Sequence, residues 1–173
     1  MPGSGKTTVG QDLARVQKYL FIDTDQFIEQ ELAKKTIEQI FEQEGEDAFR
    51  NFEKLALEHI SALASSGQNL VVATGGGLPL YQDNFVKLSA IGTTIYLDCQ
   101  WQTLATRLME QYESLNVERP LLDLASAKSD PDNLNKKLLE LLQIRAKIYE
   151  KAHHCIDTTN LSAKEVVERL KAF

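Results

Sequence analysis

A glycine-rich segment at residues 3–8 has the residue types that hold phosphate groups. It reads Gly-Ser-Gly-Lys-Thr-Thr and matches the end of the motif G-x-x-x-x-G-K-[ST], whose backbone N–H groups curl around phosphate oxygens. In that motif the lysine, here Lys6, reaches the β- and γ-phosphates, and the next hydroxyl, here Thr7, ligates Mg²⁺. A helix predicted directly after the loop would point the positive end of its dipole at the same phosphates. The alternative is a plain glycine-rich turn.

Two further segments follow predicted strands. Asp23-x-Asp25 ends one apolar run, and Gly75–Gly77 directly follows another. Open α/β sheets bind their ligands at the carboxyl ends of strands, so the two acids would serve Mg²⁺ and a substrate hydroxyl. The glycines would let a ligand meet backbone N–H groups. The alternatives are a helix N-cap for the acids and a flexible loop for the glycines.

The arginines are few enough to consider one by one. Arg119 lies in the polar segment 112–131, which predicts a mobile loop, and closure of that loop would bring it to a transferring phosphoryl group. Arg50 and Arg145 lie on predicted helices. There, a solvated surface charge is the alternative to a ligand-binding role.

Short apolar strands alternate with helices, a pattern that predicts an α/β fold with a parallel sheet. The strands are expected at residues 19–22, 70–73, 93–97 and 154–157. The helices are expected at residues 7–19, 27–33, 37–44, 48–63, 83–89, 103–111, 134–152 and 162–170. Gly45 predicts a break between two helices, and Ser162 with Glu165 has the spacing of a capping box.

The strand that would lead into the phosphate loop is not in the sequence. Since such a strand lies inside the sheet, its loss would expose two strand edges. We therefore expect a segment to be missing ahead of Met1. The alternative is that the chain folds without this strand or borrows one from a neighbour.

Composition limits the remaining possibilities. A chain of 173 residues predicts one domain, and a net charge of −6 argues against a general nucleic-acid binder. No stretch approaches the ~20 apolar residues of a membrane span, and no secretory signal is apparent. Cys99 and Cys155 offer no disulfide framework or metal-ligand spacing, which suits a reducing cytosol. We expect a cytoplasmic monomer with no nucleic-acid or membrane partner.

Together these motifs resemble the shikimate kinase family over nearly the whole chain. The segments that carry the resemblance are M-P-G-S-G-K-T-T at 1–8, F-I-D-T-D at 21–25, I-E-Q-I-F-E-Q-E-G-E-D-A-F-R-N-F-E at 37–53, T-G-G-G at 74–77, E-R-P-L-L at 118–122, I-R-A-K-I-Y at 144–149 and I-D-T-T at 156–159. The phosphate loop alone is shared by many nucleotide-binding proteins, whereas this combination is far more specific.

The resemblance implies a three-layer α/β/α P-loop kinase fold with a short parallel sheet of strand order 2-3-1-4-5, whose first strand is missing here. It also implies a single domain over residues 1–173, with a shikimate-binding segment near 26–55 and a mobile lid near 110–131.

It further implies a role for each matching residue. ATP would be bound by Gly3, Ser4, Gly5, Lys6, Thr7, Thr8, Arg107, Arg119 and Asn160. Shikimate would be bound by Asp25, Arg50, Gly75, Gly76, Gly77 and Arg145, with the two arginines on its carboxylate. Mg²⁺ would be held by Thr7 and, through water, by Asp23. The catalytic residues would be Lys6, Asp25 and Arg119.

The implied reaction is phosphorylation of shikimate by ATP to shikimate 3-phosphate, with Mg²⁺, in aromatic amino-acid biosynthesis. One alternative is another compact P-loop kinase, acting on gluconate or a nucleoside. Those kinases lack the joint arrangement of Arg50, the three glycines and Arg119-Pro120. A second alternative is a non-catalytic nucleotide-binding derivative, which the presence of Lys6, Asp25 and Arg119 disfavours.

Overall fold

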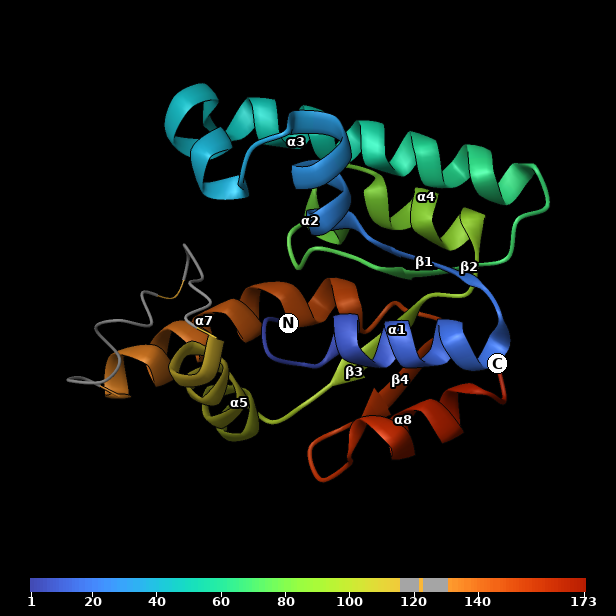
Figure 1. The fold of residues 1–173 in the computed structure, drawn as a ribbon. Coiled ribbons are helices and arrows are strands. Elements are labelled where there is room, and N and C mark those ends of the chain that lie inside the picture. Colours follow the sequence, from blue (N-terminus) through green and yellow to red (C-terminus); the bar gives the residue numbers. More distant parts are fainter. Residues whose placement is uncertain (116–121, 123–130) are drawn as a thin grey trace. The chain divides into compact units, whose positions relative to one another are not determined.

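The computed structural model describes residues 1–115, 122 and 131–173, which form two compact units (Figure 1). The first unit consists of Met1–Gly5 and Ile95–Leu161, and the second of Lys6–Thr94 and Ser162–Phe173. A single domain over the whole chain stays a prediction, and each unit is described by itself.

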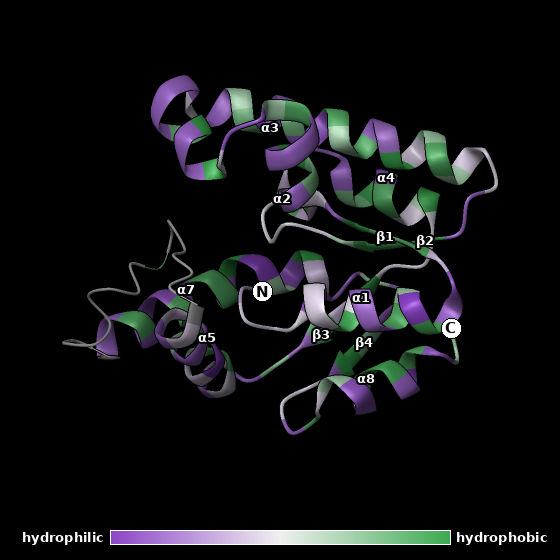
Figure 2. Ribbon diagram, in the orientation of Figure 1, coloured by the Kyte–Doolittle hydropathy of each residue, from purple (hydrophilic) through white to green (hydrophobic). Residues whose placement is uncertain are grey.

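The second unit is built on two parallel strands, β1 (Leu20–Asp23) and β2 (Leu70–Ala73). Both are short apolar runs, as their colouring in Figure 2 shows. Asp23 is paired with Ala73, so the two strands end level with each other. The residues that follow each strand therefore emerge side by side at one edge of the sheet.

Helices cover this strand pair. Helix α1 (Lys6–Gln17) contacts both strands, and α8 (Ala163–Leu170) packs against α1. Gly10 permits the close approach of α1, because a Cβ atom there would lie 2.7 Å from the ring of Phe21. The expected capping box of Ser162 at the start of α8 is confirmed.

The connection from β1 to β2 is helical throughout most of its length. It contains α2 (Thr24–Phe27), the π-helix η1 (Ile28–Ala33) and α3 (Ile37–Ser65). Helix α3 is broken at Gly45, which has φ 82° and ψ 178°, so the break predicted there is confirmed. Ile28 and other apolar side chains of η1 and α3 form a buried cluster that anchors the connection.

A short 3₁₀ helix, η2 (Leu78–Leu80), and helix α4 (Asn84–Ile91) follow β2. Figure 1 shows α3 and α4 on the side of the β1–β2 pair opposite α1. Asn84 is buried, and its side-chain amide donates to the carbonyl oxygen of Leu78 at 3.0 Å. This hydrogen bond ties the start of α4 to η2.

The first unit contains the other parallel pair, β3 (Ile95–Asp98) and β4 (His154–Asp157), with Asp98 paired to Asp157. Helices α5 (Trp101–Leu115) and α7 (Pro131–Tyr149) pack against each other. None of the helices in the described part of the chain is long and apolar enough to cross a membrane.

The α/β class with parallel strands is confirmed. The described strands form two separate pairs, β1–β2 and β3–β4. The expectation that the loop begins at Tyr112 is wrong, because α5 continues to Leu115. Buried Leu104 and Leu108 are followed by Tyr112 at the same four-residue spacing, which extends the apolar face of the helix. Most of the expected lid, residues 116–121 and 123–130, lies outside the described residues.

Candidate active site

The phosphate loop has the backbone that its glycines predict. Gly3 and Gly5 have φ values of 73° and 85°, in the left-handed region that glycine adopts without strain. The hydroxyl of buried Ser4 donates to the carbonyl oxygen of Met1 at 2.9 Å, which closes the turn. Helix α1 begins at Lys6, directly after the loop. The predicted sequence of glycine loop and helix start is therefore present.

Asp23 links the start of α1 to the end of β1. Its Oδ2 accepts a hydrogen bond from Thr7 Oγ1 at 2.6 Å. Its Oδ1 accepts from the backbone N–H groups of Asp25 and Gln26, at 3.1 and 3.3 Å, and so caps α2. The capping alternative thus holds together with the pairing to Thr7. A hydroxyl and a carboxylate this close are hard oxygen donors that fit Mg²⁺ completed by water and phosphate oxygens.

Asp25 lies against the first glycine after β2. A Cβ atom added to Gly75 would overlap Asp25 Oδ1 and would lie 3.1 Å from its Cγ. On the other side, the N–H of Gly75 donates to Thr24 Oγ1 at 2.8 Å. Glycine is needed at position 75 because of this close approach and not because of its backbone angles.

Arg50 lies against the third glycine. A Cβ atom on Gly77 would lie 3.2 Å from Arg50 Nη1. The guanidinium donates to Glu53 Oε2 at 2.7 Å and, through Nη2, to Glu46 Oε1 at 2.7 Å. It also lies over the ring of Tyr81, 5.2 Å from the centroid. Only 18% of the Arg50 side chain is exposed, so the solvated-surface alternative does not describe it.

The two carboxylates that pair with Arg50 differ in burial, because Glu53 is buried and Glu46 is exposed. Glu53 is 1% exposed, and this burial raises the pKa of its carboxyl, while the hydrogen bond from Arg50 opposes the rise and the charge of Asp25 adds to it. Burial lowers the pKa of Arg50, but the hydrogen bonds to Glu53 and Glu46 outweigh it and the net shift is upward. The guanidinium is therefore held charged and in a fixed orientation.

These contacts place a carboxylate and a guanidinium against Gly75 and Gly77, two positions apart in one segment. A guanidinium suits a carboxylate ligand, and an aspartate accepts hydrogen bonds from hydroxyls. The arrangement fits a small anion that carries hydroxyl groups.

In the first unit, the Arg107 guanidinium hydrogen-bonds to backbone carbonyl oxygens. It donates to the carbonyl oxygens of Thr158 and Leu161, at 3.1 and 3.4 Å. The structure thus brings Arg107 to the turn that contains Asn160, the other residue expected near adenine. Burial raises the pKa of the neighbouring Cys99 thiol, although Arg107 opposes the rise.

Arg145 is a buried residue of α7, 8% exposed, and it hydrogen-bonds Tyr149 one turn further along the helix. Burial raises the pKa of the Tyr149 hydroxyl, and the charge of Arg145 opposes the rise. Arg145 and Arg50 belong to different units, so their joint role on one carboxylate stays a prediction. Arg119 lies outside the described residues.

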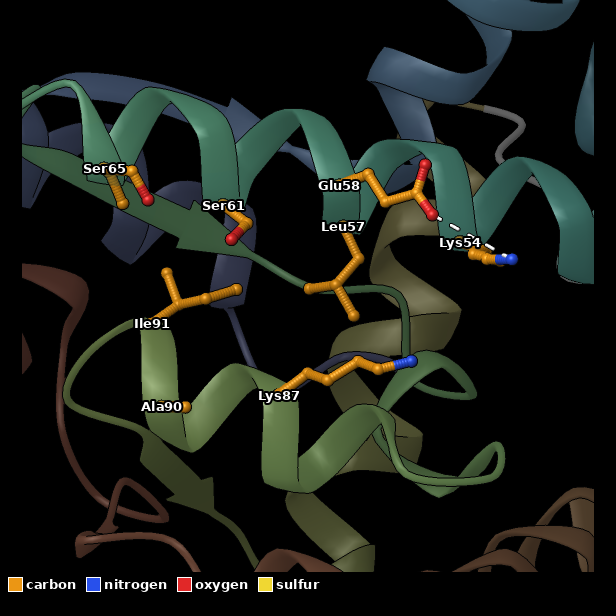
Figure 3. Close-up of a pocket in the computed structure, with 9 residues that line it drawn as sticks. Lys54, Leu57, Glu58, Ser61, Ser65, Lys87, Ala90 and Ile91 are labelled. Carbon is orange, nitrogen blue, oxygen red and sulfur yellow. Dashed lines mark ion pairs between the residues drawn. The ribbon is translucent and has the colours of Figure 1, made fainter.

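A surface pocket of about 510 Å³ lies between α3 and α4 (Figure 3). Leu57 and Ile91 are apolar residues of its lining, and its two lysines are paired within their own helices, Lys54 with Glu58 and Lys87 with Asp83. None of the candidate site residues lines it. The pocket is therefore not part of the candidate active site.

Three residues of the site escaped the sequence analysis. Thr24 is the unspecified middle residue of the pattern Asp23-x-Asp25, although strands that end level would place it beside the glycine segment. Glu46 precedes Arg50 by four residues, a spacing that puts both on one helix face and could have revealed the pair. Tyr81 carries no spacing signal.

The fold and the phosphate loop define the class of P-loop kinases. Comparison with known proteins is more specific: residues 2–173 match the family model described as shikimate kinase. A shikimate kinase of Clostridium botulinum (strain Okra / Type B1) is 42% identical over 92% of this chain and 85% of the relative. One of Bacillus cereus (strain AH187) is 37% identical over 98% of this chain and 91% of the relative.

Among solved structures, a shikimate kinase from Acinetobacter baumannii in complex with shikimate has a TM-score of 0.82 and 34% identity. The alignment covers 98% of this chain and 86% of that one. This chain belongs to the shikimate kinase family.

Proposed function

We propose that this protein transfers the γ-phosphoryl group of ATP to a hydroxyl of shikimate, giving ADP and shikimate 3-phosphate. The observation that carries the proposal is the placement of Asp25 and Arg50 against Gly75 and Gly77. Shikimate is a small carboxylate with three hydroxyls, so it matches a guanidinium and a carboxylate on one glycine segment.

Each acceptor residue then has a task. Arg50 and Arg145 bind the carboxylate of shikimate, and Gly75, Gly76 and Gly77 line the pocket. Asp25 orients the attacking hydroxyl and takes its proton. Since the transition state of phosphoryl transfer is loose, orientation is the larger part of this contribution.

The nucleotide residues hold and stabilise the transferring group. Residues 3–8 cradle the phosphates of ATP, and Lys6 and Arg119 stabilise the negative charge on the phosphoryl oxygens. Arg107 and Asn160 lie near adenine. Thr7 and Asp23 would hold Mg²⁺, which would supply positive charge against the phosphate groups of ATP.

The proposal extends to the cellular setting. Both cysteines are free, which supports a reducing cytoplasm. The acidic charge supports small-molecule substrates, with no nucleic-acid or membrane partner. A monomer is expected, and light scattering after gel filtration measures it directly.

The testing experiment is a coupled assay of ADP release with ATP and Mg²⁺, with shikimate or gluconate as the acceptor. We expect turnover with shikimate and only background ADP release with gluconate. Calorimetric titration of shikimate provides a second readout, and Arg50→Lys should weaken the binding. Turnover on gluconate alone, or shikimate affinity that is indifferent to Arg50, would overturn the proposal.

A further inference from the structure

Thr24 stands between the two aspartates of the site, and its side chain has 0% exposure. Its hydroxyl oxygen accepts a hydrogen bond from the N–H of Gly75, which lies 51 residues further along the chain, at 2.8 Å. The strand register explains the meeting, because Asp23 and Ala73 are paired and the following residues emerge together. A buried polar side chain is thus committed to the backbone of the glycine segment.

The segment after β2 is tied at both ends. Downstream, the N–H of Leu80 donates to the carbonyl oxygen of Gly77 at 2.9 Å, and Asn84 holds Leu78. Upstream, the side-chain tie is Thr24. The backbone of Gly75–Gly77 is therefore held between a threonine hydroxyl on one side and the turn of η2 on the other.

The position of this backbone sets the spacing of the charged groups. Asp25 lies against Gly75, and Arg50 lies against Gly77, both closely enough that a methyl group would crowd them. Thr24 and Asp25 are consecutive in the first turn of α2, so Gly75 meets the hydroxyl and the carboxylate of one rigid turn. A shift of Gly75 away from Thr24 changes its distance from Asp25 as well.

We propose that Thr24 is a positioning residue of the acceptor site: its hydroxyl fixes Gly75, and through it the spacing between Asp25 and Arg50. Thr24 itself does not touch the substrate. The identity of the acceptor as shikimate rests on the proposed function, whereas the tie between Thr24 and Gly75 does not.

Two substitutions separate the hydrogen bond from packing. Thr24→Val keeps the volume but leaves the buried N–H of Gly75 without its acceptor, which is costly. Thr24→Ser keeps the hydroxyl and removes only a methyl group. A third variant, Ile60→Val, removes a methylene from a buried position of α3 and controls for a general loss of stability.

The experiment measures kcat and both KM values for the four proteins. We expect Thr24→Val to raise the KM for shikimate about tenfold, on the scale of one buried hydrogen bond. The KM for ATP should stay within about twofold of wild type, and Thr24→Ser should recover most of the loss. Ile60→Val should lower Tm by about 2–4 °C and leave both KM values unchanged.

Several results would overturn the inference. They are an unchanged KM for shikimate in Thr24→Val, an equal rise for both substrates, or a Thr24→Ser enzyme as impaired as Thr24→Val. If the wild-type protein does not act on shikimate, the proposed function is refuted but the tie between Thr24 and Gly75 is still untested by kinetics. Amide hydrogen exchange at Gly75 then decides: at least tenfold faster exchange in Thr24→Val than in Thr24→Ser supports the tie, and equal rates refute it.

Discussion

The two parallel strand pairs of this protein end in similar ways but differ in what lies beside their ends. In each pair a strand ends with an aspartate followed by a buried threonine, Asp23-Thr24 after β1 and Asp157-Thr158 after β4. Each threonine reaches across to the neighbouring connection. Thr24 accepts from the N–H of Gly75, and Thr158 donates to the carbonyl oxygen of Asp98, both at 2.8 Å.

The two ends differ in the surroundings of their aspartate carboxylates. At the β3–β4 end, Asp98 Oδ1 accepts from the Tyr96 hydroxyl and the N–H of Cys99, at 2.8 and 2.9 Å, and Asp157 binds the N–H of Thr159. At the β1–β2 end, Asp23 likewise accepts from nearby groups, the Thr7 hydroxyl and the N–H of Asp25, whereas the Asp25 carboxylate, two residues after the strand, lies against Gly75. An aspartate at a strand end is thus not by itself a functional signal. The feature that sets the β1–β2 end apart is the close contact of Asp25 with Gly75, where a Cβ atom would overlap the carboxylate.

The largest expected effect contrasts the two ends directly. Asp25→Asn should lower kcat about 100-fold or more, because the role we propose for Asp25 is to orient and deprotonate the acceptor hydroxyl. Asp98→Asn keeps an acceptor oxygen for its local hydrogen bonds and should leave kcat within about threefold. Steady-state kinetics of both variants tests the contrast. Similar losses of kcat in the two variants would remove the distinction.

Arg50→Ala should raise the KM for shikimate roughly 10- to 100-fold, since a charge-assisted hydrogen bond contributes about 1.5–3 kcal/mol. The KM for ATP should change little. Because Arg50→Ala strips buried Glu53 of its partner, Arg50→Lys serves as the variant that keeps the charge and loses the planar fork. Equal changes in the two KM values would contradict a carboxylate-binding role for Arg50.

Gly75→Ala tests the space beside Asp25. The added methyl group overlaps the carboxylate, so kcat/KM for shikimate should fall about tenfold, on the scale of 1–3 kcal/mol for forced packing. Gly92→Ala is the matched control, because a Cβ atom there meets nothing within 4 Å and its backbone is extended. If both alanine variants keep wild-type kinetics, the close approach of Asp25 to Gly75 does not matter for activity.

The smallest effect concerns stability and pH. Burial raises the pKa of Glu53 above its ordinary value of 4.5, so the contribution of its protonated form to stability is present below that pH. That contribution is lost as pH rises through the raised pKa. The Tm of wild type minus that of Glu53→Gln should therefore fall as the pH is raised above 4.5. Thermal melts measure the difference, and a constant value would contradict the raised pKa.

Apolar runs made much of the fold predictable. The strands at 70–73 and 154–157 have the predicted bounds, because turn residues flank short apolar runs. The strand predicted at 93–97 begins two residues later, at Ile95, since Thr93 and Thr94 also have high β propensity. Helix α2 begins at Thr24 instead of the predicted residue 27, because Asp23 caps it.

The candidate site also has features that the sequence predicts and features that it does not. Asp25, Arg50 and the glycines were predictable singly, because their types and positions after strands or on a helix face indicate ligand chemistry. The contact of Thr24 with Gly75 was not, because it depends on a strand register that spans 51 residues of sequence. The functional roles of all these residues, and those of Arg119 and Arg145, stay predictions.

Residues 23–25 are three consecutive positions whose side chains make different contacts. Asp23 contacts Thr7 and caps α2, Thr24 holds Gly75, and Asp25 lies against that glycine from another direction. Along a helical turn each residue is rotated by about 100° from the one before, so one inserted or deleted residue here would reassign all three at once. A substitution at one of these positions damages only the contacts of that side chain, whereas a change in length damages the contacts of all three. We therefore expect the spacing of this tripeptide to tolerate less variation than its individual side chains.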